Sequence, residues 1–471
     1  MKGAKREALS DLLGGLDPAE AALLAQATEY DRQCGADTLP HDLILDSIRP
    51  ALQRLGRPMD RRLTPRRLFC KPFEDLLGAP TVSHKHRGRI ARSSIGPVWD
   101  WLCHDLAPER MAGLCEKARQ ALISGDDQTI RDAGIRLCGF GGLVLSKTLE
   151  TAPAGSPQAA ALAGRLGGDR ILEDARDMAM VLEISDDILA MLDGLPRPIC
   201  DLEDTHMDLI RITYDTIVRE LPDHAPFVIF VAMGRLSKPW EVLRLIGHLT
   251  NRATDTFVTE TDLGACGALL LADIEDISAF FDALDPGTAQ DADIVHQLDY
   301  FARLSKGMSL EMDIAREGTW GQRLTEARTR ISGKMETVLD HARRHVEAAL
   351  ASAAQAGAGQ AGASQGQGSS PDPQTRRLAV DKAHLLAQTR YFAESAAFSG
   401  PSGKVICELT DRLDELVGSI SAAVGSTTPG ESAERIKPQA TLARDLCRAL
   451  LDPEAAEIRV RRLTAALNTA E

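Results

Sequence analysis

Apolar residues recur at helical spacing along most of this chain. Leu172, Ala175, Met178, Ala179 and Leu182, for example, follow one another at intervals of one or three residues, in the pattern that places side chains on one face of an α-helix. No segment keeps the strict alternation of apolar and polar residues that is typical of a half-buried strand. The pattern therefore predicts an all-α, multi-helical fold.

Helix starts are marked by a capping residue in front of a proline, an arrangement that favours the first helical turn. Such pairs are Asp17-Pro18, Ser156-Pro157, Asp285-Pro286 and Asp452-Pro453. Periodicity and start signals together predict helices at residues 4–14, 18–33, 40–55, 65–77, 97–105, 108–123, 127–150, 157–166, 169–192, 201–220, 224–233, 239–248, 262–284, 288–316, 320–353, 376–397, 402–424, 432–449 and 453–469.

One segment, Phe227–Val231, is apolar at every position and resembles a strand. It stands alone between Pro226 and Gly234, and a single strand leaves its backbone hydrogen-bonding groups unsatisfied. We therefore predict a buried helix here. Aromatic residues make up only 4% of the chain, so the core must consist mainly of Leu, Ile, Val and Ala.

The chain is long enough for several domains, because its 471 residues exceed the roughly 250–300 that a single hydrophobic core usually serves. From Ala354 to Gln374 the composition changes to Gly, Ala, Gln and Ser, which is typical of a flexible linker. We predict two helical lobes, 1–150 and 151–353, followed by the linker 354–374 and a tethered C-terminal helical module, 375–471.

The nine cysteines form no CxxC pair, so the sequence predicts neither a disulfide framework nor a zinc ribbon. The first residues lack the apolar stretch of a signal peptide, and the apolar runs are about half the roughly 20 residues that span a bilayer. Basic residues are mostly Arg, and Ala and Gly are abundant, a bias that we associate with GC-rich bacterial genomes. We expect a cytoplasmic bacterial protein.

Positive charge is concentrated in one stretch, Arg54–Arg92, which we call the basic segment. Its eleven Arg and Lys residues and three acidic residues give +8, whereas the whole chain carries −14 and the remainder therefore −22. Charge this polarised indicates an anionic partner. The predicted partner-binding residues are Arg61, Arg62, Arg66, Arg67, Lys71, Lys85, Arg87, Arg89, Arg92, Ser93 and Ser94.

Two helix starts are predicted along this part of the chain, one within the basic segment at Thr64-Pro65 and one just after it, following Ser93 and Ser94. Serine hydroxyls and free amides at a helix N-terminus, beside arginines, form a favourable seat for an anion. The alternative is that these cations pair with the chain's own excess carboxylates.

Three other patterns match ligand sites only in part. Gly141–Thr148 has Ser146 where a phosphate loop needs its second glycine, so it predicts a helix packed closely through its glycines. His341 and His345 are one helical turn apart but lack further ligands. The acidic region from Glu183 to Asp208 lacks both the DDxxD pattern of isoprenoid enzymes and the paired Glu-x-x-His of di-iron bundles. The sequence therefore predicts no catalytic residue, no metal and no cofactor.

These observations predict a non-enzymatic adaptor, scaffold or regulatory protein whose basic segment binds an acidic or phosphorylated protein partner. Nucleic acid is disfavoured, because no recognition helix or stacking aromatics accompany the cations and the acidic remainder repels a polyanion. An anionic membrane surface is a further candidate partner. The alternative function is an α-helical enzyme whose 61–92 arginines hold a phosphorylated or carboxylate small molecule. The oligomeric state stays open.

Overall fold

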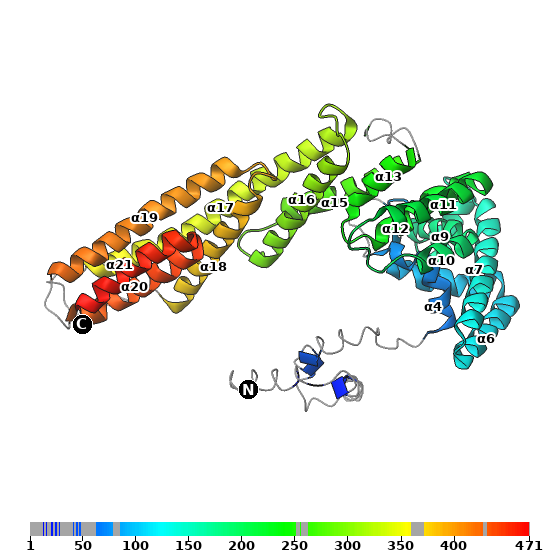
Figure 1. Cartoon of the computed structure of the whole chain (residues 1–471), viewed down its shortest axis with the longest axis horizontal. Coiled ribbons are helices and arrows are strands. Elements are labelled where there is room, and N and C mark those ends of the chain that lie inside the picture. The colour runs from blue at the N-terminus through cyan, green and yellow to red at the C-terminus, as the bar shows by residue number, and fades with distance from the viewer. Residues whose placement is uncertain are drawn as a thin grey trace. The chain divides into compact units, whose positions relative to one another are not determined.

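The computed structural model of the chain is all-α (Figure 1). It describes residues 63–78, 85–250, 262–358, 372–426 and 431–470, together with Asp255 and isolated positions between 13 and 48. Within this described part, the only strands are β1 (Leu77–Gly78) and β2 (Ile90–Ala91), which pair in parallel. The predicted fold class is confirmed.

The helices follow one another with short connections. The α-helices are α4 (Pro65–Cys70), α5 (Ile95–Asp100), α6 (Pro108–Ser124), α7 (Asp127–Glu150), α8 (Pro157–Leu166), α9 (Asp169–Glu183), α10 (Ser185–Asp193), α11 (Asp204–Glu220), α12 (Ala225–Arg235), α13 (Val242–Thr250), α15 (Gly264–Ala283), α16 (Asp291–Glu311), α17 (Thr319–Ala358), α18 (Pro373–Thr389), α19 (Ser399–Ser426), α20 (Glu431–Leu450) and α21 (Pro453–Ala470). Shorter turns are the 3-10 helices η1 (Lys71–Leu76), η2 (Arg92–Ser94), η4 (Pro222–His224), η5 (Pro239–Glu241) and η6 (Arg390–Phe392), and the π-helix η3 (Trp101–Leu106).

Several predicted helices are corrected by the structure, and the one expected at 376–397 is α-helical only to Thr389. The helix expected at 65–77 is α-helical only to Cys70 and continues as the 3-10 helix η1, because Pro72 lacks the amide hydrogen that the α-helical ladder needs. The helix expected at 169–192 is two helices, separated at Ile184 with φ −105° and ψ 21°. Those expected at 4–14, 18–33 and 40–55 lie largely outside the described residues.

The chain divides into two compact units, which interleave along the sequence. Unit 1 consists of Met1–Lys71 and Trp99–Val144, and unit 2 of Pro72–Val98 and Leu145–Glu471. The basic segment therefore crosses from unit 1 into unit 2.

Unit 1 has close helix contacts made possible by a glycine. A Cβ at Gly141 in α7 would lie 2.7 Å from Cε2 of Phe69 in α4, so only glycine allows this approach. Phe69 is buried and meets Trp99 edge-on, with 5.1 Å between ring centroids. Gly141 thus confirms the predicted helix with close glycine packing. Gly139 does not contribute, because a Cβ added there would meet no atom within 4 Å.

In unit 2, the strand-like segment is the buried helix α12, as predicted. All its residues from Ala225 to Met233 are buried, and α12 contacts α11, α13 and α15. A helix that is apolar on every face is stable when other elements surround it, which explains why no amphipathic pattern marked this segment.

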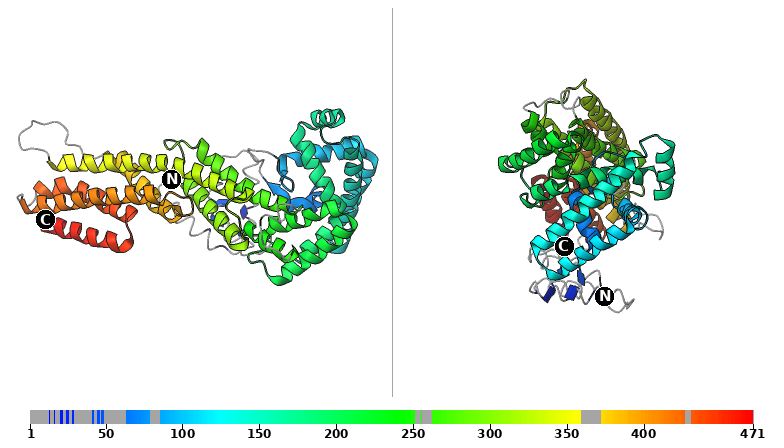
Figure 2. Two further views of the ribbon diagram at one scale, coloured as in Figure 1. Left: turned by 90° about the horizontal axis from the view of Figure 1, so that it is seen from above. Right: turned by 90° about the vertical axis from the view of Figure 1, so that its right-hand side faces the viewer.

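The long helix α17 organises the later part of unit 2. It packs against α15, α18, α19 and α20, while α18 to α21 also pack on one another (Figure 2). Ser332 Oγ of α17 donates to the Ala397 carbonyl at 2.8 Å, and Lys382 Nζ of α18 lies 2.6 Å from Asp291 Oδ1 of α16. Of the predicted linker 354–374, residues 359–371 lie outside the described residues.

Candidate functional site

The residues predicted to bind a partner are divided between the two units. Arg61 and Arg62 lie outside the described residues. Unit 1 holds Arg66, Arg67 and Lys71, and unit 2 holds Lys85, Arg87, Arg89, Arg92, Ser93 and Ser94. In unit 1, Thr64 caps α4 by accepting a hydrogen bond from the Arg67 amide at 3.2 Å, and Arg66 and Lys71 are exposed.

Lys85 is an internal anchor. Its Nζ lies 2.8 Å from Asp174 Oδ1 and 2.6 Å from Asp177 Oδ2, and it also donates to the Arg89 carbonyl. Asp174 is fully buried and Asp177 is 7% exposed. Buried carboxylates are destabilising unless they are paired and hydrogen-bonded. Asp174 and Asp177 therefore require the Lys85 ammonium group.

The same two carboxylates fix the backbone that follows. Asp177 accepts from the Gly88 amide at 2.9 Å, and Asp174 accepts from the Ala91 amide at 3.0 Å and from Ser94 Oγ at 2.6 Å. Burial raises the pKa of Asp177, and Lys85 and the Gly88 amide oppose that rise. Ser94 is buried and engaged in this way, so its hydroxyl is not open to a ligand.

The position of Gly88 requires a glycine. Its φ of +84° lies in the left-handed region, and a Cβ would lie 2.6 Å from the Phe230 ring. Only glycine adopts this backbone conformation at little cost and leaves room for the ring.

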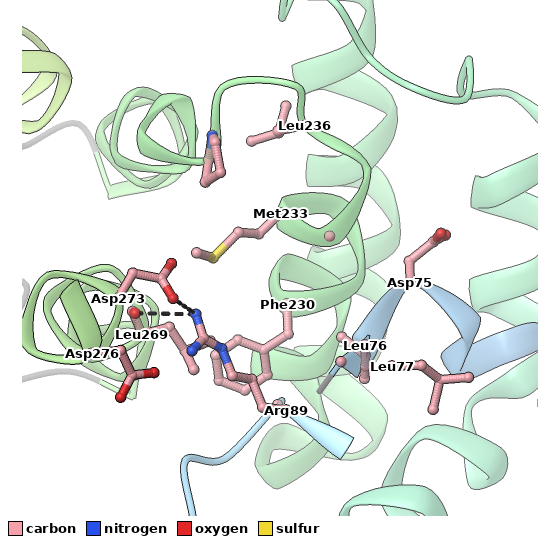
Figure 3. Close-up of a pocket in the computed structure, with 14 residues that line it drawn as sticks. Asp75, Leu76, Leu77, Arg89, Phe230, Met233, Leu236, Leu269, Asp273 and Asp276 are labelled. Atoms are coloured by element: carbon pink, nitrogen blue, oxygen red, sulfur yellow. Dashed lines mark hydrogen bonds and ion pairs between the residues drawn. The ribbon is translucent and has the colours of Figure 1, made fainter. Parts of the chain in front are cut away.

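Arg89 pairs with a carboxylate at the edge of a cavity (Figure 3). Its guanidinium contacts Asp273 of α15 and donates to the Leu269 carbonyl at 3.5 Å. Tyr300 of α16 donates its hydroxyl to Asp273 at 3.3 Å, and burial together with Asp273 raises the pKa of that phenol. Burial and the Arg89 guanidinium lower the pKa of His86 below its usual 6.5, so this imidazole is neutral at pH 7.

The cavity beside Arg89, about 470 Å³ in volume, is called here the Arg89 cavity. Phe230 and Met233 of α12 supply its apolar wall (Figure 3). Three carboxylates, those of Asp75, Asp273 and Asp276, also line it. Asp75 is held by Arg235 at 2.8 Å and by Arg197 at 3.0 Å. The polar lining is thus mainly acidic.

Arg87 and Arg92 differ from these anchors, because both are exposed. Arg87 Nη2 donates to the Asp223 carbonyl at 2.7 Å, and its Cζ lies 5.1 Å from the centroid of the Phe227 ring. Within the described part of the chain, no carboxylate forms an ion pair with Arg87 or Arg92. Arg87 is therefore oriented by a neutral carbonyl and a ring, and its charge remains available.

The sequence did not reveal the carboxylates that determine which of these cations are paired internally. Asp174 and Asp177 lie on the apolar face of α9, between residues such as Ala175 and Met178 that are fully buried. An acidic residue on a buried helix face requires a partner. The position of these two residues within the apolar pattern of α9 is therefore the sequence feature that indicates an internal ion pair. Asp273 carried no comparable signal.

The partial motifs have structural roles. Gly141–Thr148 lies within α7, and Glu203 with His206 forms a capping box at the start of α11. His341 and His345 bring their Nε2 atoms within 3.3 Å. Across the described residues, no group of three or more His, Cys, Asp and Glu side chains is arranged to hold a metal ion.

Comparison with known protein families, with curated proteins and with solved structures finds no match to this chain. Of the helices that the structure describes, none combines the length and the apolar character needed to cross a membrane.

Proposed function

We propose that this chain is a non-enzymatic interaction protein that binds an acidic or phosphorylated protein partner through the exposed cations of its basic segment. Arg87 is the observation that carries the proposal. It is exposed, it is held by the Asp223 carbonyl and the Phe227 ring, and no described carboxylate pairs with it. A guanidinium oriented before binding loses less conformational freedom when a carboxylate or phosphate arrives.

The buried contacts that Asp174 and Asp177 make with the basic segment support this role, because they hold the backbone around Arg87. Lys85 and the Gly88 amide are bound to Asp177, on either side of Arg87 in the sequence. Arg92, also exposed, follows the Ala91 amide that Asp174 holds. Buried carboxylates thus rigidify the segment, and its outward cations supply the charge that attracts an anionic partner.

The alternative, a helical enzyme acting on a phosphorylated or carboxylate small molecule, rests on the Arg89 cavity. Arg89 already pairs with Asp273 there, and Asp75 and Asp276 add negative charge to the lining. Those carboxylates would repel an anionic substrate. Arg87 therefore favours the binding role.

A cytoplasmic location is part of the proposal. The described cysteines are free thiols, as expected of a protein in a reducing compartment. No cofactor is proposed, and an anionic membrane surface remains the competing partner for the same cations.

The test measures binding of two labelled peptides by fluorescence anisotropy, one rich in Glu and one of equal length containing phosphoserine. We expect the wild-type affinity to fall as salt is added, and the double variant Arg87→Glu, Arg92→Glu to bind at least about tenfold more weakly. Because His86 is neutral at pH 7, the affinity for the Glu-rich peptide should be nearly constant between about pH 7 and 8 and should rise at lower pH as the imidazole gains its proton.

A matched control changes charge equally elsewhere in unit 2. Arg448 and Arg462 are exposed on α20 and α21, and replacing both with Glu should leave peptide binding within about twofold of wild type. Equal loss in both double variants, or none in the first, would contradict the proposal. Capture by anionic vesicles without peptide binding would identify the membrane as the partner.

A further inference from the structure

A second cavity lies in unit 2, bounded by the last residues of α7, the loop after it, α9 and His224 of η4. We call it the α7–α9 cavity. Its volume of about 470 Å³ is within the range of small-molecule sites. Its charged lining residues are Glu150, Arg176 and Glu183, and Leu149 and Met180 supply apolar surface. It shares no lining residue with the Arg89 cavity.

Arg176 brings a positive charge to the wall of the α7–α9 cavity. Its Nη2 donates to the Ala152 carbonyl, which orients the guanidinium without neutralising it. No carboxylate in the described part of the chain forms an ion pair with it. The remaining N–H groups of a guanidinium match the two oxygens of a carboxylate.

Negative charge comes from Glu150 and Glu183. Glu150 is exposed, and Glu183 Oε2 lies 2.6 Å from His224 Nε2. His224 Nδ1 is buried and has no hydrogen-bond partner among the described residues. His224 thus engages one oxygen of the Glu183 carboxylate, and no described residue bonds to the other oxygen.

Both kinds of charge are carried by the same face of α9. Arg176 and Glu183 are seven residues apart, so they lie two helical turns from each other, roughly 10 Å along the helix axis. An extended peptide advances about 3.3–3.6 Å per residue. Two or three residues therefore cover a comparable distance.

We propose that the α7–α9 cavity binds a short apolar peptide, two or three residues long, with both termini free. The C-terminal carboxylate pairs with Arg176, the N-terminal ammonium with Glu183, and the apolar side chains contact Leu149 and Met180. A purely anionic ligand meets two carboxylates and a purely cationic ligand meets Arg176, so a zwitterion fits the charges best. This inference is independent of the basic segment.

Isothermal titration calorimetry of the full chain with the dipeptide Leu-Leu tests the proposal. We expect binding, weakened at least about tenfold when the N-terminus is acetylated and also when the C-terminus is amidated. Free leucine should bind more weakly than Leu-Leu, because it spans less of the cavity. No binding of Leu-Leu, equal binding of the capped peptides, or tighter binding of leucine would overturn it.

Two variants assign each terminus to its residue. Arg176→Gln should remove the preference for Leu-Leu over its amide, and Glu183→Gln should reduce the preference for Leu-Leu over its acetylated form. Because each preference compares two ligands on one protein, partial loss of folded protein does not alter it. Arg219→Gln, an exposed change on α11, should keep both preferences. Unchanged preferences in Arg176→Gln would refute the assignment.

Discussion

A lysine and an arginine two residues apart have opposite roles in the basic segment. The Lys85 side chain is only 11% exposed and lies between Asp174 and Asp177. Arg87 is exposed and has only neutral partners. One cation compensates two buried carboxylates, so its removal takes away the charge that pairs with both of them, whereas an exposed cation is already solvated by water.

Lys85→Met should therefore lower the free energy of unfolding by about 3–5 kcal/mol, the typical effect of breaking a buried ion pair. Methionine retains most of the aliphatic stem, so the lost charge dominates the effect. Urea denaturation followed by circular dichroism measures the change. Arg92→Met, the exposed control, should stay within about 0.5 kcal/mol of wild type. Similar stabilities for the two variants would show that Lys85 is not an anchor.

At the scale of elements, glycines set how closely helices approach. In α15, a Cβ at Gly267 would lie 1.9 Å from Cη2 of Trp320 in α17, and both residues are buried. A Cβ at Gly307 of α16 would likewise lie 2.3 Å from Cγ of Trp240 in η5. A tryptophan ring thus fits against a helix backbone at each contact, and the contact is lost if the glycine gains a side chain.

Gly267→Ala should be destabilising by about 1–3 kcal/mol, the usual effect of overpacking a core. Gly333→Ala, at an exposed position of α17, is the matched control, since no atom lies within 4 Å of its Cβ position. That change should be stabilising by about 0.5–1 kcal/mol, because alanine loses less backbone freedom in a helix. Thermal unfolding of the two variants compares them directly, and a stable Gly267→Ala protein would argue against the close contact.

At the scale of the whole chain, the helices before and after the predicted linker 354–374 also pack against each other. Helices α18, α19 and α20 all contact α17, and their buried side chains include Leu386, Leu409 and Leu446. The C-terminal helices therefore share a core with α17, in addition to the predicted tether.

A specific protease site introduced at Gly368-Ser369, inside the predicted linker, separates the covalent connection from packing. After cleavage, we expect the two fragments to elute together in size-exclusion chromatography and to separate only in denaturing gels. Leu386→Asp buries a charge in the shared core and should release the C-terminal fragment. If the unmodified fragments elute apart, packing does not hold them together.

Local interactions explain what the sequence by itself determined. Thr64 and Ser156 each accept a hydrogen bond from an amide three residues on, so the starts of α4 and α8 follow from neighbouring residues. Apolar periodicity likewise determined the all-α class, and the isolation of Phe227–Val231 determined α12. Each of these inferences needs only a few consecutive residues.

Only the tertiary structure decided which cations of the basic segment are available. Lys85 meets Asp177, 92 residues later, and Arg89 meets Asp273, 184 residues later. Charge density along the sequence is the same whether a cation faces water or a buried carboxylate. The distinction depends on which helix packs against the segment, and that depends on contacts between residues far apart in the chain.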